Sequence, residues 1–362
     1  MELGLSPPLP TRNGVSASCI ALPSVNPFAS GSTSSRPTNL INAETEQHGG
    51  ENIFPNPTYA GNSLNAAVEQ HKAANLFAAG TIAHFLAQQF PAISAQEWSQ
   101  RIAAGNVVDE HGVAVTPTRA FEAGVRIYYY RALETEPRIP FDEVILFQDE
   151  QLVVVDKPHF LPVIPSGRYL QETLLVRLKR KLDIETLVPI HRIDRGTAGV
   201  IVFSVQESTR GKYQQLFATR DVRKTYEAIA PIHRALHFPL THESCLVPDQ
   251  HFMRMKEMAG KANSQTHFEM IRELTPTLAL YRLRPITGRK HQLRVHCAAL
   301  EIPIVNDPMY PTFLPEPARD ALEDFSKPLQ LLARAVEFID PITGAARAFT
   351  SVRQLELLAT HP

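Results

Sequence analysis

The sequence predicts an α+β fold in which a mixed, mostly antiparallel sheet with flanking helices follows a smaller α/β unit. Apolar runs at residues 144–147 and 152–155 surround a turn at 149–150, as expected of an antiparallel hairpin. After this hairpin, strand-like runs alternate irregularly with one or two helical patterns, which argues against a doubly wound parallel sheet. Pro137 and Pro140 mark a linker in front of the hairpin, so we expect two folded units.

The first segment, residues 1–62, is rich in Ser, Pro, Asn, Thr and Gly and has no sustained periodicity. Such a segment offers too little apolar surface to offset the entropy that is lost on ordering. We therefore predict a mostly disordered tail.

The small unit spans residues 74–132. Ile82, Phe85, Leu86 and Phe90 recur at helical spacing, and Ser94 forms a capping box with the glutamate at 97 that opens a second helix. Short strand-like runs follow at 107–108, 113–115 and 125–130. In the last run, the rings of residues 128–130 could stack on bases, although strand alternation would put one or two of them in a core.

The large unit spans residues 143–358, after a linker at 133–142. A helix predicted around 170–182 carries Leu174, Leu178 and Leu182 on its buried stripe. Its basic side chains are then left for solvent or phosphate; they are Arg177, Lys179, Arg180 and Lys181.

Composition bounds the class of protein. The chain has 362 residues, of which 44% are hydrophobic, and no apolar run approaches the roughly 20 residues of a membrane-spanning helix. The N-terminus lacks the layout of a secretory signal. The three cysteines of the chain show no paired spacing. We expect a monomeric cytoplasmic protein with reduced thiols and no membrane partner.

The charge distribution is more informative than the net charge of −1. Residues 168–224 contain twelve Lys or Arg against six Asp or Glu, and further cations follow at 282–294. Such clustering is the electrostatic footprint of a nucleic-acid phosphate backbone, although a solvated helix face has the same composition.

The most informative motif is His191-Arg192-Ile193-Asp194-Arg195-Gly196-Thr197, which leads into the apolar run 200–203. It places one aspartate between two arginines. A carboxylate beside fixed cations stays ionised at neutral pH and can act as a nucleophile, whereas alone such a cluster is more often structural.

Three further blocks accompany this motif in the same order as in a known family. They are residues 152–167 with Lys157-Pro158, residues 223–226 with Lys224 and Tyr226, and residues 284–307 with Arg289, His291 and Arg294. Together the four blocks resemble the RluA-type pseudouridine synthase family over roughly residues 143–352. The small unit resembles the α-L RNA-binding module that many of these enzymes carry.

The resemblance implies an RNA pseudouridine synthase that acts on structured RNA, either tRNA or ribosomal RNA, by flipping the target base. It implies that Asp194 acts at the ribose, either by attack on C1′ or by proton abstraction, with Arg294 as its partner and Tyr226 beside the base. Substrate contacts are expected from Arg192, His191, Lys157, Lys224, Arg289 and His291. Arg192 is expected to fill the space that the flipped base leaves, or to be a second ion-pair partner of Asp194.

The sequence departs from the family pattern at three positions. Ala198 replaces the usual serine, while Glu301 and Asn306 stand where glycine is usual. None of these changes removes a catalytic group, so they affect the expected loop geometry and substrate choice and leave the reaction intact.

Two other functions remain open. A non-catalytic RNA-binding or ribosome-assembly factor could keep the same scaffold, but it would not need an anion in a phosphate-binding cleft. A glycoside hydrolase usually needs two carboxylates that flank the bond, and no second acidic residue stands out near Asp194.

Neither a cofactor nor a metal is predicted. The sequence has no phosphate-binding Gly-rich loop and no nucleotide-cofactor fingerprint. His233, His237, His242 and Cys245 could suggest zinc, but Pro239 interrupts the stretch and no second ligand cluster accompanies it.

Overall fold

The structure, a computed structural model, describes residues 11–12, 14–15, 17–28, 76–91, 93–130, 136–251, 253–314 and 323–360. The chain forms two compact units, Met1–Leu133 and Glu134–Pro362. In the described part of the chain, no helix has both the length and the apolar character that crossing a bilayer requires.

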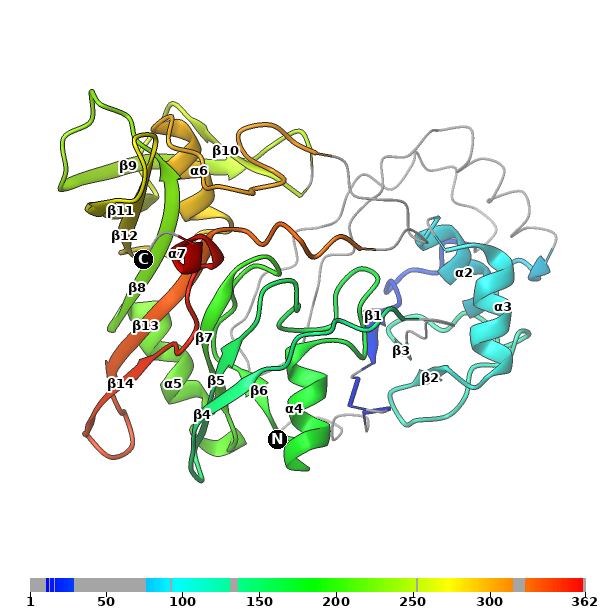
Figure 1. Cartoon of the computed structure of the whole chain (residues 1–362). Helices are drawn as coiled ribbons and strands as arrows, with labels where there is room; N and C mark the ends of the chain where they lie inside the picture. Colours follow the sequence, from blue (N-terminus) through cyan, green and yellow to red (C-terminus); the bar gives the residue numbers. More distant parts are fainter. Residues whose placement is uncertain are drawn as a thin grey trace. The chain divides into compact units, whose positions relative to one another are not determined.

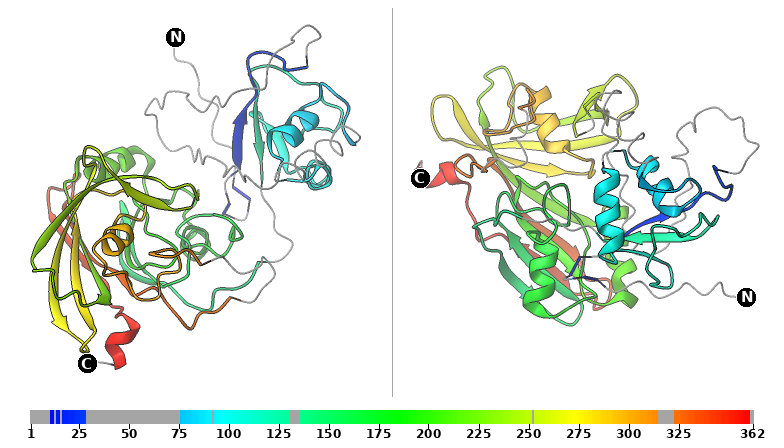
Figure 2. Two further views of the ribbon diagram at one scale, coloured as in Figure 1. Left: turned by 90° about the horizontal axis from the view of Figure 1, so that it is seen from above. Right: turned by 90° about the vertical axis from the view of Figure 1, so that its right-hand side faces the viewer.

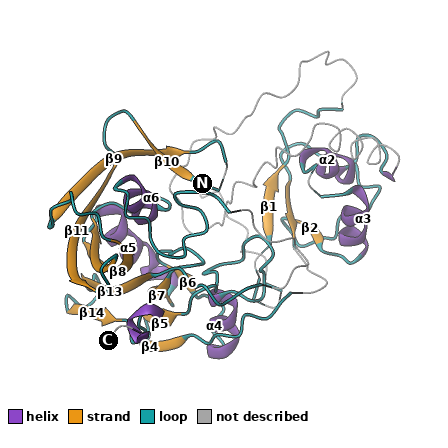
Figure 3. Ribbon diagram, turned by 45° about the horizontal axis from the view of Figure 1, so that its top comes forward, coloured by secondary structure: helices purple, strands orange, loops and turns teal. Residues whose placement is uncertain are grey.

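The small unit is a three-stranded antiparallel sheet with two helices on one side (Figure 3). Its strand order is β1 (Ser18–Ala21), β3 (Arg126–Tyr129), β2 (Val107–Asp109). Helices α2 (Ile82–Gln89) and α3 (Ala95–Ala103) begin at Thr81 and Ser94, whose side-chain oxygens accept hydrogen bonds from backbone N–H groups of the first turn. The N-cap half of the predicted capping box is thus confirmed, because the Glu97 N–H donates to Ser94 Oγ, while the Glu97 carboxylate pairs with Arg101.

The core of the small unit is aromatic. Trp98 is fully buried and packs against Phe90 and Tyr129. Tyr130 is also buried and lies under the guanidinium of Arg12. Two of the three tyrosine rings at 128–130 are therefore covered by the fold and cannot serve as open stacking surfaces.

Strand β1 corrects the prediction for residues 1–62. Residues 18–21 pair with β3 along their whole length, and Val15 and Leu22 are buried. The prediction of a disordered tail is wrong for this stretch because four residues suffice to complete a sheet edge, which a search for long periodic runs does not detect. Of the predicted tail, residues 1–10, 13, 16 and 29–62 lie outside the described residues.

The large unit contains one sheet with eleven described strands, in the order β10-β9-β11-β12-β8-β13-β7-β5-β4, with β14 on β13 and β6 on β7 (Figure 1). All its pairings are antiparallel except the one between β7 and β13, so the predicted mixed, mostly antiparallel sheet is confirmed. The sheet twists strongly between its two ends (Figure 2). The strands are β4 (Val144–Gln148), β5 (Leu152–Lys157), β6 (Val188–Pro189), β7 (Ala198–Ser204), β8 (Val222–Pro231), β9 (Leu240–Pro248), β10 (Met255–Met258), β11 (Ser264–Glu273), β12 (Leu278–Pro285), β13 (Leu331–Ile339) and β14 (Ala346–Thr350).

Four helices flank this sheet: α4 (Leu174–Leu182), α5 (Glu207–Thr219), α6 (Gln292–Ala299) and α7 (Glu356–Thr360). Strands β5 and β7 are buried along their whole length because helices cover both of their faces. Alternate residues of these strands pack against α4 on one face and against Tyr213 of α5 on the other. Helix α6 packs on the neighbouring part of the sheet, against β11 and β12.

The predicted linker belongs largely to the large unit. The carboxylate of Glu136 accepts hydrogen bonds from the N–H groups of residues 170–172, and Ile139 is buried in the α4 core. Arg177 donates to the carbonyls of Phe141 at 2.7 Å and Ile139 at 2.6 Å. The predicted solvent-facing role of Arg177 is therefore wrong: this arginine holds the connecting segment against α4.

Candidate active site

Asp194 lies in the tight loop that leads into β7. The loop is closed by a hydrogen bond from the Thr197 N–H to the Asp194 carbonyl, 3.1 Å long. Two side chains from the end of β5 hold its backbone, because Lys157 Nζ donates to the Arg195 carbonyl at 3.1 Å and His159 Nδ1 lies 2.7 Å from the Gly196 carbonyl. The loop is thus anchored to the end of the buried strand β5.

Lys157 corrects the expectation of a substrate contact. Its side chain is fully buried, and its ammonium group also donates to the carbonyls of Pro158 and Leu161. All three donors of the amine therefore have protein acceptors. Burial, with the nearby charge of Arg195, lowers the pKa of Lys157 well below its ordinary value. Lys157 positions the loop that carries Asp194 and has no donor left for RNA.

Arg294, in the first turn of α6, joins two carboxylates. Its Nη1 donates to Asp194 Oδ2 at 3.0 Å, while Nε and Nη2 bind the two oxygens of Asp307 at 2.8 and 2.7 Å. The Asp307 side chain is fully buried and the Asp194 side chain is 29% exposed. The arginine is therefore fixed from behind by a bidentate pair and presents its remaining side to the carboxylate that substrate can reach.

Asp194 is kept ionised. Burial by itself raises the pKa of this carboxyl, but the positive charge of Arg294 and the hydrogen bond from its guanidinium oppose this, and the net pKa is below the ordinary value. The pKa of His291 is lowered to about 4 because the ring is buried, so this side chain is neutral at pH 7. Arg294 is the permanent cation at the site, since burial lowers its pKa but Asp307 and Asp194 raise it further.

His291 is oriented by a tyrosine. It caps α6 in a left-handed conformation with φ of 55°, and its Nδ1 lies 2.9 Å from the hydroxyl of Tyr310. That hydroxyl accepts from the Met255 N–H and keeps its own hydrogen to donate, which matches a neutral His291 that accepts at Nδ1. The Nε2–H of the ring then faces Asp194 Oδ1 at 3.8 Å. His291 and Arg294 thus meet Asp194 from one face of the helix start, as their spacing predicted.

Tyr226 is half-buried on β8 and packs against the core next to α6. Burial raises the pKa of its hydroxyl, and the negative charge of Asp194 raises it further. The structure therefore brings the tyrosine within electrostatic reach of the aspartate and keeps its hydroxyl protonated.

A basic cleft opens two residues before Tyr226 on the same strand. Its volume is about 610 Å³, and Lys224, Arg220, Arg223 and Arg284 line it together with Asp221 and Glu337. Lys224 borders the loop at Gly288, where an added Cβ would lie 3.7 Å from Nζ. Through Lys224, the basic cleft thus adjoins the loop that precedes α6.

The other residues predicted to contact substrate differ in solvent exposure. Arg192 and Arg289 are exposed, and Arg289 Nε donates to the Asn263 carbonyl at 3.3 Å. His191 points away from Asp194, since its Nε2 accepts from the Val202 N–H and its ring stacks on Phe217. Burial lowers the pKa of His191 to about 3, so it is a neutral packing residue. The expected substrate contact of His191 is therefore wrong.

Sequence reasoning assigned no role to Asp307 and Tyr310, which hold Arg294 and His291. A weak signal was available for Asp307, because an aspartate two residues after the apolar run 302–305 needs a cationic partner if it is buried. The residue before it, Asn306, and also Glu301 adopt positive φ angles of 63° and 60°. These are the positions at which the family pattern has glycine, which explains that pattern in terms of backbone conformation.

The chain is similar in sequence to known RNA pseudouridine synthases. The sequence pattern of the RNA pseudouridylate synthase family matches residues 151–299. The dual-specificity RNA pseudouridine synthase RluA of Haemophilus influenzae is 30% identical over 213 residues, which cover 57% of this chain and 91% of that protein. RluA of Escherichia coli is 33% identical over 174 residues, which cover 46% and 76%. Ribosomal large subunit pseudouridine synthase D of Xanthomonas campestris is 29% identical over 275 residues, which cover 72% and 81%.

The matched region contains the anchored aspartate loop, the tyrosine strand and the first turn of α6. With relatives at this identity covered over most of their length, the chain belongs to the RluA-type family of RNA pseudouridine synthases, isomerases that form pseudouridine in RNA.

Proposed function

We propose that the protein isomerises uridine in tRNA or ribosomal RNA, with Asp194 acting at the ribose of a flipped-out nucleotide. The observation that carries this proposal is an ionised, partly exposed carboxylate fixed by Arg294. The reaction breaks the bond between uracil N1 and ribose C1′, turns the base, rejoins it through C5 and releases the C5 proton. A carboxylate that stays charged can act at the ribose, by attack on C1′ or by removal of a ribose proton.

The surrounding residues have distinct roles in this proposal. Tyr226 packs on the uracil ring, with its protonated hydroxyl near C5. Arg192, exposed on the same loop, fills the place of the extruded base in the RNA stack. The Xanthomonas relative is named for the large ribosomal subunit, which supports ribosomal RNA as one substrate.

The RNA backbone is proposed to follow the basic cleft beside Lys224. Four cations against two carboxylates line this cleft, and it adjoins the strand that carries Tyr226. The small unit is proposed to be a second RNA contact, as its resemblance to the α-L module implies. We also expect a monomer in the cytoplasm, where free thiols such as the three cysteines of this chain are usual.

Other functions fit the geometry less well. A glycoside hydrolase needs a second free carboxylate, but Asp307 is fully buried and bound through both oxygens by Arg294. A non-catalytic RNA-binding factor has no use for an ionised carboxylate that faces phosphates.

Replacing Asp194 with Asn tests the proposal. The change keeps the shape of the side chain but removes its charge, so we expect pseudouridine formation to fall by several orders of magnitude while RNA affinity is kept or slightly improved. The assay is pseudouridine mapping in RNA from cells without the gene, complemented with either variant, and single-turnover kinetics on the RNA so identified. Exposed Asp324→Asn is the control and should behave as wild type. Near wild-type rates for a folded Asp194→Asn protein would refute the assignment, and no modification by the wild type would favour the binding factor.

The cleft is tested separately by binding. Substituting Arg220 and Arg284 with Ala should weaken binding to RNA of any sequence. The slope of log affinity against log salt concentration should fall by about two, one for each phosphate contact that is lost. Lys212 and Lys261, exposed elsewhere on the unit, provide a double-alanine control with the same change in net charge. Equal affinities for the two double variants over a range of salt concentrations would place the backbone elsewhere.

A further inference from the structure

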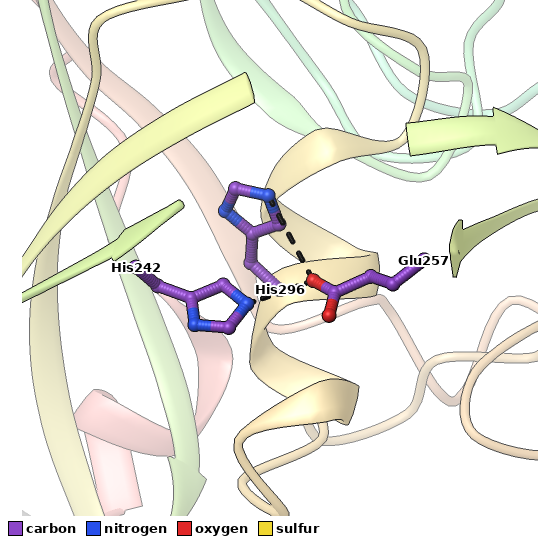
Figure 4. A group of neighbouring side chains, drawn as sticks. All are labelled: His242, Glu257 and His296. Atoms are coloured by element: carbon purple, nitrogen blue, oxygen red, sulfur yellow. Dashed lines mark hydrogen bonds and ion pairs between the residues drawn. The ribbon is translucent and has the colours of Figure 1, made fainter. Parts of the chain in front are cut away.

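Three side chains that the proposed reaction does not use converge beside α6. His242 comes from β9, Glu257 from β10 and His296 from α6 (Figure 4). His242 Nε2 lies 2.8 Å from Glu257 Oε1, and His296 Nε2 lies 4.0 Å from the same oxygen. All three potential ligand atoms lie within 4.8 Å of one another.

This set of donors matches zinc chemistry. Two imidazole nitrogens and one carboxylate oxygen form one of the common three-ligand zinc sites, with bonds of about 2.0 to 2.2 Å. Tetrahedral ligands at that bond length are separated by roughly 3.3 to 3.5 Å. The distances of 2.8 and 4.0 Å to Glu257 Oε1 fall on either side of this separation, and all three atoms lie within 4.8 Å of one another.

The surroundings support ligation at His296. The ring is fully buried, and its Nδ1 lies 2.9 Å from the hydroxyl of Thr266. A hydrogen bond at the second ring nitrogen is the usual way in which a metal-binding histidine is oriented.

The site has one open side. The side chains of His242 and Glu257 are 22% and 27% exposed, whereas that of His296 is closed from solvent. The hydroxyls of Ser244 and Ser264 lie 3.1 and 3.0 Å from His296 Nε2. An ion could therefore enter from the β9–β10 side, where water completes its coordination.

We propose that His242, Glu257 and His296 bind one divalent transition-metal ion, with zinc as the best match, and that the ion fixes α6 to the β9–β10 hairpin. The consequence for the enzyme is structural, because α6 also carries Arg294, two residues before His296. The histidine-rich stretch at 233–245 contributes only His242; the other two ligands come from segments distant in sequence.

Zinc binding to the full-length protein tests this proposal. After chelator treatment and removal of any affinity tag, we expect one equivalent of Zn²⁺ to bind in calorimetric titration and to raise the melting temperature. His242→Ala and Glu257→Ala each remove a direct ligand, so the affinity should fall by more than the about 10- to 100-fold typical of outer contacts. His237→Ala is the matched control, because it removes an exposed imidazole next to the same strand without touching the cluster.

Because His296 is fully buried, a variant at this position would test folding as well as metal binding. We therefore test His296 by spectroscopy of the wild-type protein. Zinc at Nε2 leaves the ring hydrogen on Nδ1, which nitrogen-detected NMR of labelled histidine identifies. Stoichiometric binding that depends on His242 and Glu257, with His296 in that form, supports the site. Absence of stoichiometric binding to the wild type, unchanged affinity in the two ligand variants, or loss of binding in His237→Ala would each overturn it.

Discussion

At the residue scale, the position of Arg294 is decided by Asp307. The carboxylate takes two hydrogen bonds from the guanidinium and two more from the N–H groups of Met309 and Tyr310. Because Asp307 is fully buried, it cannot contact RNA and acts only through the arginine. It is a positioning residue for the Asp194 site.

Replacing Asp307 with Asn should lower kcat by about 100-fold, the cost that a misplacement of about 1 Å carries at a reacting centre. It should also destabilise the fold by about 3 to 5 kcal/mol, since one charge of a buried pair is removed. Single-turnover kinetics and urea unfolding measure the two effects.

Asp340→Asn is the control for this experiment. Asp340 is also buried and pairs with an arginine, Arg347, at 3.1 Å, but it lies at the end of β13 next to Tyr213. This variant should lose stability without a specific loss of kcat. A similar loss of kcat in both variants would reduce Asp307 to a general stabilising residue.

At the element scale, the close pairing of β7 with β13 depends on Gly199. Its φ is +115°, and an added Cβ would lie 2.2 Å from the Ala333 carbonyl oxygen. Gly199 belongs to the parallel pairing in the sheet, which begins at Ala198, four residues after Asp194. A side chain at this position would separate β7, the strand that follows the Asp194 loop, from its neighbour β13.

Gly199→Ala should therefore destabilise the large unit by several kcal/mol, as backbone strain and overpacking combine. Gly211→Ala in α5 is the matched control, because its added Cβ meets nothing within 4 Å and alanine favours the helix by roughly 0.5 to 1 kcal/mol. Urea unfolding should give opposite signs for the two variants. A stable Gly199→Ala protein would show that the strands can move apart without cost.

At the scale of the whole molecule, buried neutral histidines set the response to acid. Burial lowers the pKa of His159 to about 4, of His191 to about 3 and of His291 to about 4, from an ordinary value of 6.5. An unfolded histidine takes up a proton as the pH falls through 6.5, while the folded one does not. Protonation therefore favours the unfolded state between pH 6.5 and about 4.

We expect the free energy of unfolding to fall over this window by roughly 1.4 kcal/mol per pH unit for each such histidine. Asp194 stays ionised in the same window because its pKa is lowered. The loss of activity at acid pH should therefore coincide with the loss of folded protein. Urea unfolding between pH 7.5 and 5 tests the slope. His191→Gln should reduce it and exposed His237→Gln should not; equal slopes in both would contradict this account.

Sequence by itself determined the features that depend on neighbours a few residues apart. The N-cap at Ser94, the hairpin of β4 and β5, the helix α4 and the motif around Asp194 all follow from local spacing. The family resemblance extended this to Arg294 and Tyr226, although no local rule joins positions 194 and 294.

Only the tertiary structure decided which distant residues meet and which are buried. It brought Arg294 to Asp194 across 100 positions, turned Lys157 and His191 into the interior, and added β1 to a sheet whose other strands begin near residue 107. It also joined His242 to Glu257 and His296. Periodicity and capping act over single turns and strands, whereas these contacts follow from the order of strands in the sheet and from the free energy of burying a charge.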